Sequence, residues 1–321
     1  MIGEPSRRDL LAATAAAMLA GAVRGYAQTA PVRAAGGART GGPVPPAYQY
    51  ESQIWVRLRG RAFTCYRSGD RQKYPYFYPV LGPSGRPFTE EAGHPFPHHR
   101  SLFFGCDHLN GGNYWQEGLD RGQILSRGVR IEEQTPERVV LRDACDWKRP
   151  GDAGPVVQDE RIWTLSAPSD TTRIIDADIR LTAVENVVVS RTNHSLFAIR
   201  AATELTPLEG GRLLNAAGDS GEKGTFGVES PWCGFFGTRC GQAEAIILMD
   251  HPQNPWAPTR WFTRDYGFIS PTPLNWLEKW ELPKSESVRL RYRVLVIEGP
   301  EAEPTSDAIQ SAYKDFARAT Q

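Results

Sequence analysis

Residues 172–182, TRIIDADIRLT, and residues 288–297, VRLRYRVLVI, decide the fold class of this chain. In both stretches, apolar side chains alternate one by one with charged ones. This period of two is typical of an antiparallel strand with one face buried and the other in water. The apolar face is expected to hold Ile175, Ala177, Ile179 and Leu181 in the first stretch, and Val288, Leu290, Tyr292, Val294 and Val296 in the second.

Strand-like composition continues along most of the chain, with turns rich in Gly, Pro and Asp between the segments. No alternation of strands with helices is present, so the sequence predicts an all-β fold, a single large antiparallel β-sandwich. Only the tail reads as a helix, at residues 307–319, capped by Pro304-Thr305-Ser306 and carrying an apolar stripe. Further strands are expected at residues 54–59, 62–66, 74–81, 123–131, 138–145, 160–165, 187–190, 196–201, 235–238 and 245–249.

The first residues predict export. Ser6-Arg7-Arg8-Asp9-Leu10-Leu11 matches the twin-arginine pattern. A moderately apolar run follows, and it ends at small residues that suit a cleavage site. That run is shorter than the roughly 20 residues that span a bilayer. We therefore expect a signal peptide at residues 1–27, recognised by the twin-arginine export machinery, and a periplasmic or secreted protein without stable membrane insertion.

Composition sets the remaining boundaries. Residues 28–47 are rich in Gly, Pro and Ala and predict a flexible linker. The sandwich is expected at residues 48–300, and the C-terminal helix within 301–321. The 321 residues include 37 basic and 37 acidic side chains, so the charge indicates neither a nucleic-acid footprint nor a basic membrane patch.

A disulfide framework among the five cysteines is not expected, because a chain of this length can bury a core without one. One pairing stays open: Cys233 and Cys240 could meet across a hairpin in an oxidising compartment.

Residues 94–118, HPFPHHRSLFFGCDHLNGGNYWQEG, hold four of the six histidines. Prolines and glycines interrupt this stretch, so we expect a loop and neither a helix nor a long strand. If the chain is extended at His98-His99-Arg100, His98 and Arg100 share one side and His99 points to the other. Histidine titrates near neutral pH and suits general acid or base catalysis, although a structural role is the competing interpretation.

Three further clusters could contribute to a site. Residues 107–118 bring Trp115 and Glu117, an apolar ring face and a polar group that would suit a sugar. His194 stands at the entrance of a buried strand. Residues 250–267 form a proline-stiffened loop; its candidate binding residues are Asp250, His251, Trp256, Arg264, Asp265 and Tyr266.

Several familiar motifs are missing from the sequence: GxSxG, HExxH, the P-loop and GxGxxG before a helix. The sequence therefore indicates neither hydride transfer nor kinase-type chemistry. No cofactor is predicted. A divalent metal held by His98, His194, His251 and a carboxylate is chemically feasible, but scattered single histidines are weak support for it.

Five motifs carry a resemblance to a known family: YPYFYPVLGPSGRPFT, PHHRSLFFG…NGGNYWQEG, NHSLFAIRAA, DHPQNPWAPTRWFTRDYGF and LRYRVLVIEG. They resemble the bacterial PmoA-like family, a domain of unknown function, over residues 50–298. That family is similar to proteins with the galactose-mutarotase-like supersandwich, which includes sugar epimerases and polysaccharide lyases. The resemblance thus implies a carbohydrate-related activity. We do not expect methane monooxygenase activity, because the methane monooxygenase subunit is an integral membrane protein and this sequence shows no membrane-spanning segment.

The motif positions that match are His98, His99, Arg100, Glu117, His194, Asp250, His251, Asp265 and Tyr266. The chain departs from the family pattern at Phe96, Ser101, Cys106 and the turn Trp232-Cys233-Gly234-Phe235. A metal site that needed the positions of Phe96 or Cys106 would be missing ligands here.

These observations favour an exported carbohydrate-active enzyme, a lyase, epimerase or hydrolase, acting on a sugar, glycoside or oligosaccharide. His98, His99, His194 and His251 are the candidate proton-transfer groups, and Arg100 would neutralise negative charge. Trp115 and Trp256 would form the sugar platform, while His94 and His108 support the loop. The alternatives are a non-catalytic carbohydrate-binding protein and a metal-dependent enzyme with a histidine-based site.

Overall fold

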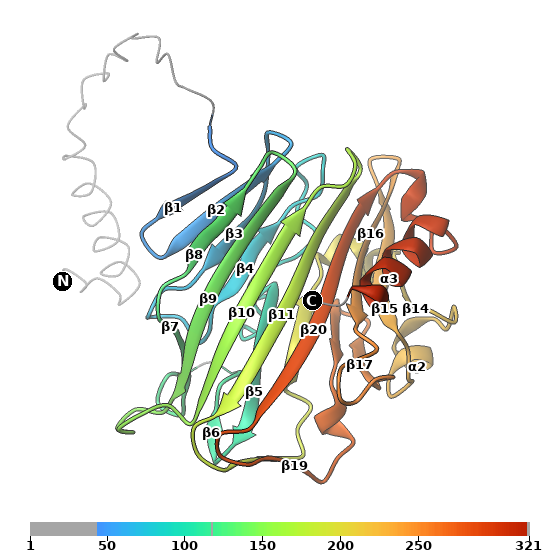
Figure 1. The fold of residues 1–321 in the computed structure, drawn as a ribbon. Helices are drawn as coiled ribbons and strands as arrows, with labels where there is room; N and C mark the ends of the chain where they lie inside the picture. The colour runs from blue at the N-terminus through green and yellow to red at the C-terminus, as the bar shows by residue number, and fades with distance from the viewer. Residues whose placement is uncertain (1–43, 117, 320–321) are drawn as a thin grey trace, which may run out of the picture. The chain divides into compact units, whose positions relative to one another are not determined.

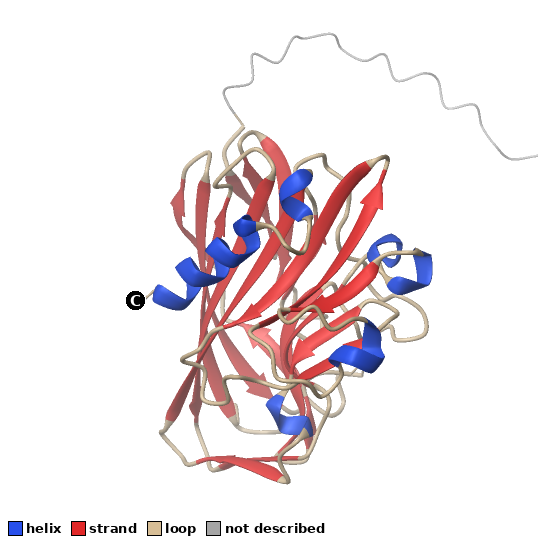
Figure 2. Ribbon diagram, turned by 90° about the vertical axis from the view of Figure 1, so that its right-hand side faces the viewer, coloured by secondary structure: helices blue, strands red, loops and turns tan. Residues whose placement is uncertain are grey.

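The computed structural model describes residues 44–116 and 118–319. The predicted signal peptide and nearly all of the predicted linker lie outside these residues, as does Glu117. Within them the chain forms two antiparallel β-sheets that lie face to face (Figures 1 and 2). The predicted all-β antiparallel sandwich is confirmed. No helix among the described residues is both long and apolar enough to cross a membrane.

The first sheet has eleven strands, and its central part carries the residues of interest below. In spatial order the main path is β1 (Ala47–Tyr50), β2 (Gln53–Leu58), β3 (Arg61–Arg67), β4 (Tyr76–Val80), β5 (Leu102–Leu109), β13 (Ser195–Arg200), β18 (Phe268–Pro271) and β17 (Trp261–Arg264). Three strands lie beside this path: β6 (Gly112–Asn113), β12 (Val187–Ser190) and β19 (Lys279–Leu282).

The second sheet has nine strands and contains both stretches that decided the fold class. Its order is β14 (Arg212–Asn215), β15 (Trp232–Arg239), β16 (Gln242–Asp250), β20 (Ser287–Glu298), β11 (Thr172–Ala183), β10 (Val157–Ser166), β9 (Arg138–Lys148) and β7 (Gln123–Ser126), with β8 (Arg130–Gln134) also paired to β9. β11 and β20 are neighbours, and their predicted apolar faces point into the core between the sheets.

The helical elements are short, and they lie at the edges or on the outer surfaces of the sheets. They are α2 (Gly221–Thr225), α3 (Asp307–Arg318) and the 3-10 turns η1 (Thr203–Leu205), η2 (Pro207–Glu209), η3 (Pro273–Asn275) and η4 (Pro300–Ala302). The predicted C-terminal helix is confirmed as α3. The hydroxyl of Ser306 accepts a hydrogen bond from the backbone N–H of Ala308 at its start, and Ile309 and Phe316 are buried against the nine-stranded sheet.

The prediction of a loop at residues 94–118 is wrong in its middle. β5 occupies Leu102–Leu109 and pairs with β4 and β13 at the centre of the eleven-stranded sheet. All its residues except His108 are buried, so the strand lacks the polar alternation that marks a half-exposed strand. Gly105 is required there, because a Cβ atom would lie 2.5 Å from the carbonyl oxygen of Tyr114, which crosses above it.

Other boundaries also differ from the sequence prediction. The expected strand at residues 123–131 is two strands, β7 and β8, and the expected loop at 250–267 gives way to β17 at Trp261. Cys233 and Cys240 do not pair: both thiols are free, with Cys233 buried at the start of β15 and Cys240 exposed beyond its end.

A buried ion pair within β10 faces the other sheet. Arg161 on β10 donates two hydrogen bonds to the carboxylate of Asp159, at 2.7 and 2.8 Å, and both side chains are fully buried. The guanidinium group lies 5.4 Å from the ring centre of Phe104 on β5, and the indole N–H of Trp147 donates to the same carboxylate. A buried charge pair of this kind is tolerated only while both partners remain.

We predict that Asp159→Asn lowers the free energy of unfolding by about 3–5 kcal/mol, because it leaves the Arg161 guanidinium buried without a counter-charge. The matched control is Asp170→Asn, which removes the carboxylate of an exposed pair with Arg59. That change should cost less than about 1 kcal/mol. Urea unfolding followed by tryptophan fluorescence measures both, and equal losses in the two variants would contradict the prediction.

Candidate functional site

The candidate site lies on the outer face of the eleven-stranded sheet, the face turned away from the second sheet. Strand alternation separates the two faces: Phe77 and Phe197 contact Trp163 and Tyr292 of the other sheet across the core. Phe103 and Phe268 occupy the alternate strand positions, so their side chains lie on the outer face, where loops pack over them.

Asp107 on β5 holds His194, which directly precedes β13. Nδ1 of His194 is 2.8 Å from Oδ2 of Asp107, and since an ionised carboxylate only accepts, Nδ1 carries the proton. The hydroxyl of Thr192 donates to the other carboxylate oxygen, and the backbone N–H of Asp107 donates to the carbonyl of His194. Asp107 is buried, whereas the His194 side chain keeps 22% of its surface exposed. The arrangement fixes the ring and leaves Nε2 as its acceptor nitrogen.

His98 lies beside His194. The two ring centres are 5.6 Å apart and the rings are nearly perpendicular. The backbone around His98 is fixed, because the hydroxyl of Tyr74, two residues before β4, donates to its carbonyl at 2.5 Å. The structure therefore brings two partly exposed imidazoles together, one from the 91–100 loop and one from the entrance to β13.

His99 is buried, with only 4% of its surface exposed, but the segment is not extended as the argument from alternation assumed. The backbone N–H of His99 donates to the carbonyl of Phe96 in a turn, and the His98 and His99 ring centres are 4.6 Å apart, so the two side chains do not point to opposite sides. The His99 ring stacks on Phe268 at 4.3 Å and lies parallel to Tyr266 at 6.1 Å. Burial in this apolar stack, together with nearby His98 and Arg200, lowers the pKa of His99 to about 2. His99 is thus neutral at all ordinary pH values and supports the loop, so its predicted catalytic role is not favoured.

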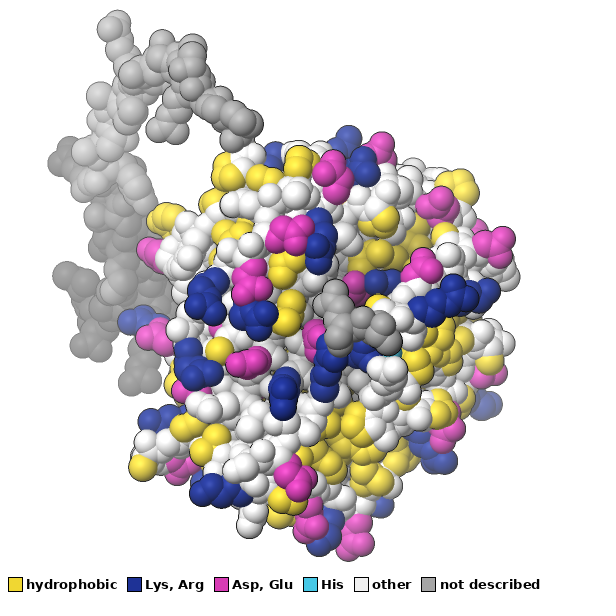
Figure 3. All heavy atoms as spheres, viewed as in Figure 1, with side chains coloured by type: hydrophobic (Ala, Val, Ile, Leu, Met, Phe, Trp, Pro, Cys, Tyr) yellow, Lys and Arg dark blue, Asp and Glu magenta, His cyan; other side chains and the backbone are white. Residues whose placement is uncertain are grey.

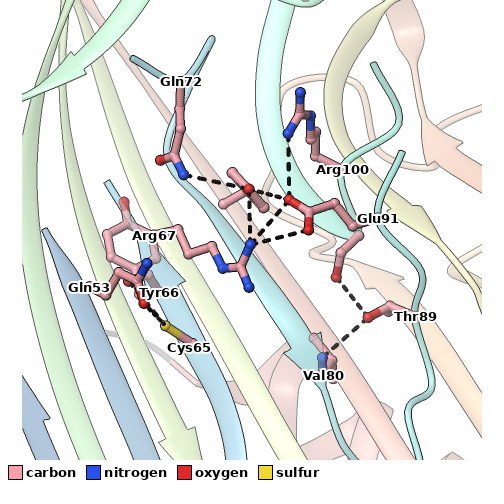
Figure 4. Close-up of polar contacts among 11 residues, drawn as sticks. Gln53, Cys65, Tyr66, Arg67, Gln72, Val80, Thr89, Glu91 and Arg100 are labelled. Atoms are coloured by element: carbon pink, nitrogen blue, oxygen red, sulfur yellow. Dashed lines mark hydrogen bonds and ion pairs between the residues drawn. The ribbon is translucent and has the colours of Figure 1, made fainter. Parts of the chain in front are cut away.

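Glu91 ties the 91–100 loop to the sheet (Figure 4). Its carboxylate accepts hydrogen bonds from Arg67 on β3 at 3.1 and 3.3 Å and from the Tyr76 hydroxyl on β4. Arg100 reaches the same carboxylate at 3.5 Å, and its backbone forms a β-bridge with that of Glu91. One carboxylate therefore joins two strands and both ends of the loop that carries His98.

Glu90 makes a second anchor beside the first. It accepts from the buried Arg200 on β13 at 2.7 Å and from the hydroxyl of Thr203. The Arg200 guanidinium also lies 4.8 Å from the ring centre of Tyr266, which lines the same side of the loop as Phe96. Tyr266 is half-buried, and it is the member of the predicted 250–267 set that reaches the histidines.

Trp115 does not form a sugar platform, contrary to the prediction. It is fully buried, with its indole stacked under the His194 ring at 5.8 Å and edge-on to Phe103 and Phe268. The close approach above Gly105 draws this segment down onto the sheet. Trp115 therefore supports His194 from below and is not available to a ligand.

His251 is not brought to the other histidines. It follows β16 in the nine-stranded sheet, is fully buried, and packs edge-on against Phe316 of α3 at 4.8 Å. Burial and the nearby Arg291 lower its pKa to about 4. The prediction of a shared site including His251 is wrong, because sequence order cannot tell which sheet a strand joins.

Asp250 and Trp256 also lie away from His98. The carboxylate of Asp250 accepts hydrogen bonds from Asn254 and Thr259, so it braces its own loop, and its burial raises its pKa to about 6. Trp256 packs edge-on against Trp280 of β19 at 5.5 Å. Their predicted role in substrate binding at the histidine site has no geometric support.

Arg264 and Asp265 lie on the outer face of the eleven-stranded sheet but are engaged with α2. Arg264 pairs with Glu222 at 3.0 Å, and the carboxylate of Asp265 accepts from the backbone N–H of Glu222 at 2.7 Å. In addition, the Arg264 guanidinium covers the rings of Phe226 and Phe262 at 4.7 and 4.0 Å. Arg264 and Asp265 therefore form part of the surface next to Tyr266.

Metal binding receives no geometric support from the described residues. Among residues 44–116 and 118–319, no three His, Cys, Asp or Glu side chains are grouped as a metal ion would require. Asp107 does contact a histidine, but its two carboxylate oxygens already bond His194 and Thr192.

Sequence reasoning missed Asp107, Glu90, Glu91, Arg67 and Arg200 as site residues. A buried aspartate inside an apolar run, LFFGCDHL, was the available signal for the first. The arginine–glutamate pairs join residues up to 110 positions apart in the chain, and nothing in a single sequence marks such pairs.

Comparisons with known proteins give a family and a loose structural likeness. A family model described as "Family of unknown function (DUF6807)" matches residues 53–314. No curated protein matches the sequence. None of the comparisons names the PmoA-like family, so that part of the resemblance stays a prediction.

Two solved structures are similar over most of the chain. One is a galactose mutarotase related enzyme from Lactobacillus acidophilus (7% identity, 82% of this chain and 99% of that chain covered, TM-score 0.29). The other is a GalM/aldose epimerase homologue from C. elegans (8% identity, 80% and 99% covered, TM-score 0.30). At these TM-scores, no property of either protein is transferred to this chain.

We predict that His99→Phe makes stability less sensitive to acid. A histidine whose pKa is lowered by folding takes up its proton mainly in the unfolded state, so stability falls as the pH drops below about 6.5. Each such histidine adds about 1.4 kcal/mol per pH unit to that slope, and His99 and His251 both contribute between pH 6 and 5.

Urea unfolding from pH 7 to 5 measures the slope. Phenylalanine retains the stacking on Phe268 but cannot titrate, so the variant should lose about half of the histidine-derived slope. His94→Phe, at an exposed position in the same loop, is the control and should keep the wild-type slope. If His99→Phe also kept it, His99 would not be the buried titrating group.

Proposed function

This chain belongs to the family of unknown function DUF6807, and for it we propose a carbohydrate-active enzyme that transfers protons to and from a sugar or glycoside through His194 and His98. The observation that carries the proposal is the hydrogen bond between Asp107 and His194 beside a second partly exposed histidine.

His194 is suited to act as the general base. Asp107 fixes its tautomer and orientation, as carboxylates do for catalytic imidazoles, and Trp115 supports the ring from below. Its partial exposure lets Nε2 meet a substrate hydroxyl or C–H group. His98, 5.6 Å away between ring centres, is placed to return a proton to another atom of the same substrate.

Proton transfer fits the described side chains better than hydrolysis by two carboxylates. Glycosidases commonly use a carboxylic acid and a carboxylate that are free to act on either side of the bond. Here Glu90, Glu91 and Asp107 are each held by an arginine or a histidine. Epimerisation or elimination is therefore the reaction class that we favour.

The surroundings suit a polyhydroxylated ligand. Tyr266 offers a half-buried ring, and the Arg67–Glu91–Arg100 cluster offers donors and acceptors a few ångströms apart. A sugar presents an apolar ring face and a hydroxyl rim, which is the combination such a surface can bind. The twin-arginine pattern at residues 6–11 further supports an exported enzyme, periplasmic or secreted.

We predict that His194→Ala and His98→Ala each lower kcat about 100-fold or more, the typical contribution of a general acid or base. A panel of aldoses, glycosides and oligosaccharides, followed by NMR for epimerised or eliminated products, supplies the assay. His94→Ala, an exposed histidine of the same loop, is the matched control and should retain activity. An active His98→Ala/His194→Ala double variant would contradict the assignment.

Asp107→Asn tests the positioning role separately. The amide no longer demands a proton on Nδ1, so the ¹⁵N NMR signals of His194 should change from the Nδ1-protonated tautomer to a mixture. Activity should fall with the fraction of the correct tautomer. An unchanged tautomer in this variant would mean that Asp107 does not orient the ring.

A further inference from the structure

A row of aromatic rings leads from the two histidines across the outer face of the eleven-stranded sheet. It starts at His98 and His99, passes to Phe268 at 4.3 Å from His99, and continues to Phe262 at 5.9 Å from Phe268. Phe226 follows at 5.3 Å from Phe262. The first sheet-borne members are buried, and the row returns to the surface at its far end.

That far end is a partly exposed pair, Phe226 and Trp276, whose ring centres are 5.5 Å apart. Gly227 makes the pairing possible: its φ of +75° suits glycine, and a Cβ atom would come within 3.0 Å of the Trp276 ring. The guanidinium groups of Arg264 and Arg260 lie over Phe226 and Trp276 at 4.7 and 5.9 Å. The far end thus repeats the combination of ring and arginine found near the histidines.

The arginines that lie over the aromatic rings are already paired with carboxylates. Arg264 pairs with Glu222 at 3.0 Å and Arg260 with Glu229 at 3.4 Å, while Arg100 and Arg200 pair with Glu91 and Glu90. A guanidinium that faces a carboxylate offers a hydroxyl group both donors and acceptors. It offers little net attraction to a substrate carboxylate or phosphate, which would also meet the neighbouring glutamate.

We propose that the substrate is an uncharged oligosaccharide, whose reacting unit lies at His98 and His194 and whose further units extend to a second subsite at Phe226 and Trp276. The inference rests on the proposed function for the location of the reacting unit. The aromatic row supplies the direction, the exposed ring pair supplies the second contact, and the paired arginines exclude a polyanion as the preferred ligand.

The test measures binding as a function of chain length. Isothermal titration uses the His194→Ala variant, which cannot turn the ligand over, with neutral gluco-, galacto-, xylo- and manno-oligosaccharides of one to six units. Oligogalacturonides of the same lengths represent charged chains. At least one neutral series should bind more tightly by about tenfold or more between one unit and the longer chains, as for a ligand that gains an aromatic anchor.

Trp276→Ala, made in the same background, should abolish the gain with length and leave the binding of one unit unchanged. Trp276→Phe keeps a ring and should retain most of the gain, which guards against a general folding defect. Trp280→Ala is the matched control, since Trp280 is also half-buried but packs against Trp256 outside the row.

Three results would overturn the inference: equal affinity for one unit and for longer chains, tighter binding of the charged series, or binding of no neutral series. Failure of the proposed function looks different. Length-dependent binding without turnover by the wild-type protein would contradict the proposed enzymatic function but support the second subsite. Turnover of single sugars that depends on His194, without any effect of chain length, would support the enzymatic function and contradict the second subsite.

Discussion

The hydrogen bond between Asp107 and His194 joins the fold to the candidate site. β5 and β13 are neighbours in the sheet, with Cys106 opposite Ser195, and the next residues on each side are Asp107 and His194. The backbone N–H of Asp107 donates to the carbonyl of His194 while the side chains bond in the opposite direction. Strand pairing therefore sets the imidazole's position, so the site needs only a buried carboxylate at the end of a ladder.

The two outer faces of the sandwich are covered by different kinds of structure. Over the nine-stranded sheet, arginines of β20 pair with aspartates of β11, as Arg293 does with Asp176 at 2.6 Å, and α3 covers an apolar patch. Figure 3 shows basic and acidic side chains interleaved on this face. Over the centre of the eleven-stranded sheet, loops take the place that α3 has on the other face, and ion pairs of Glu90 and Glu91 hold them to the strands. A loop held by charged pairs can present side chains that a packed helix would bury.

Sequence periodicity predicted the strands with one solvent-exposed face, but it missed β5, which is buried on both sides. β11 and β20 alternate because their outer face carries charged residues, and α3 shows its capping serine and apolar stripe. β5 has no wet face, so its glycine and the prolines around it suggested a loop. Periodicity also fixes which residues share a face but not which sheet a strand joins, and this is why His251 was misplaced. Trp115 lies beside His194 as expected, but nothing in the sequence pattern showed that its ring would be buried.

Burial gives two consecutive histidines different chemistry. His98 and His99 have the same side chain and share a backbone held by Tyr74, yet the His98 ring is partly exposed while the His99 ring lies in a stack of aromatic rings. The buried ring loses its ability to take up a proton, because no carboxylate accompanies it into the apolar stack. The surroundings of His194 differ: it is hydrogen-bonded to a buried carboxylate, and part of its side chain is exposed to solvent. Proton transfer on this face therefore depends less on the number of histidines than on their surroundings: His194 and His98 are partly exposed and His194 has a carboxylate partner, whereas His99 is buried.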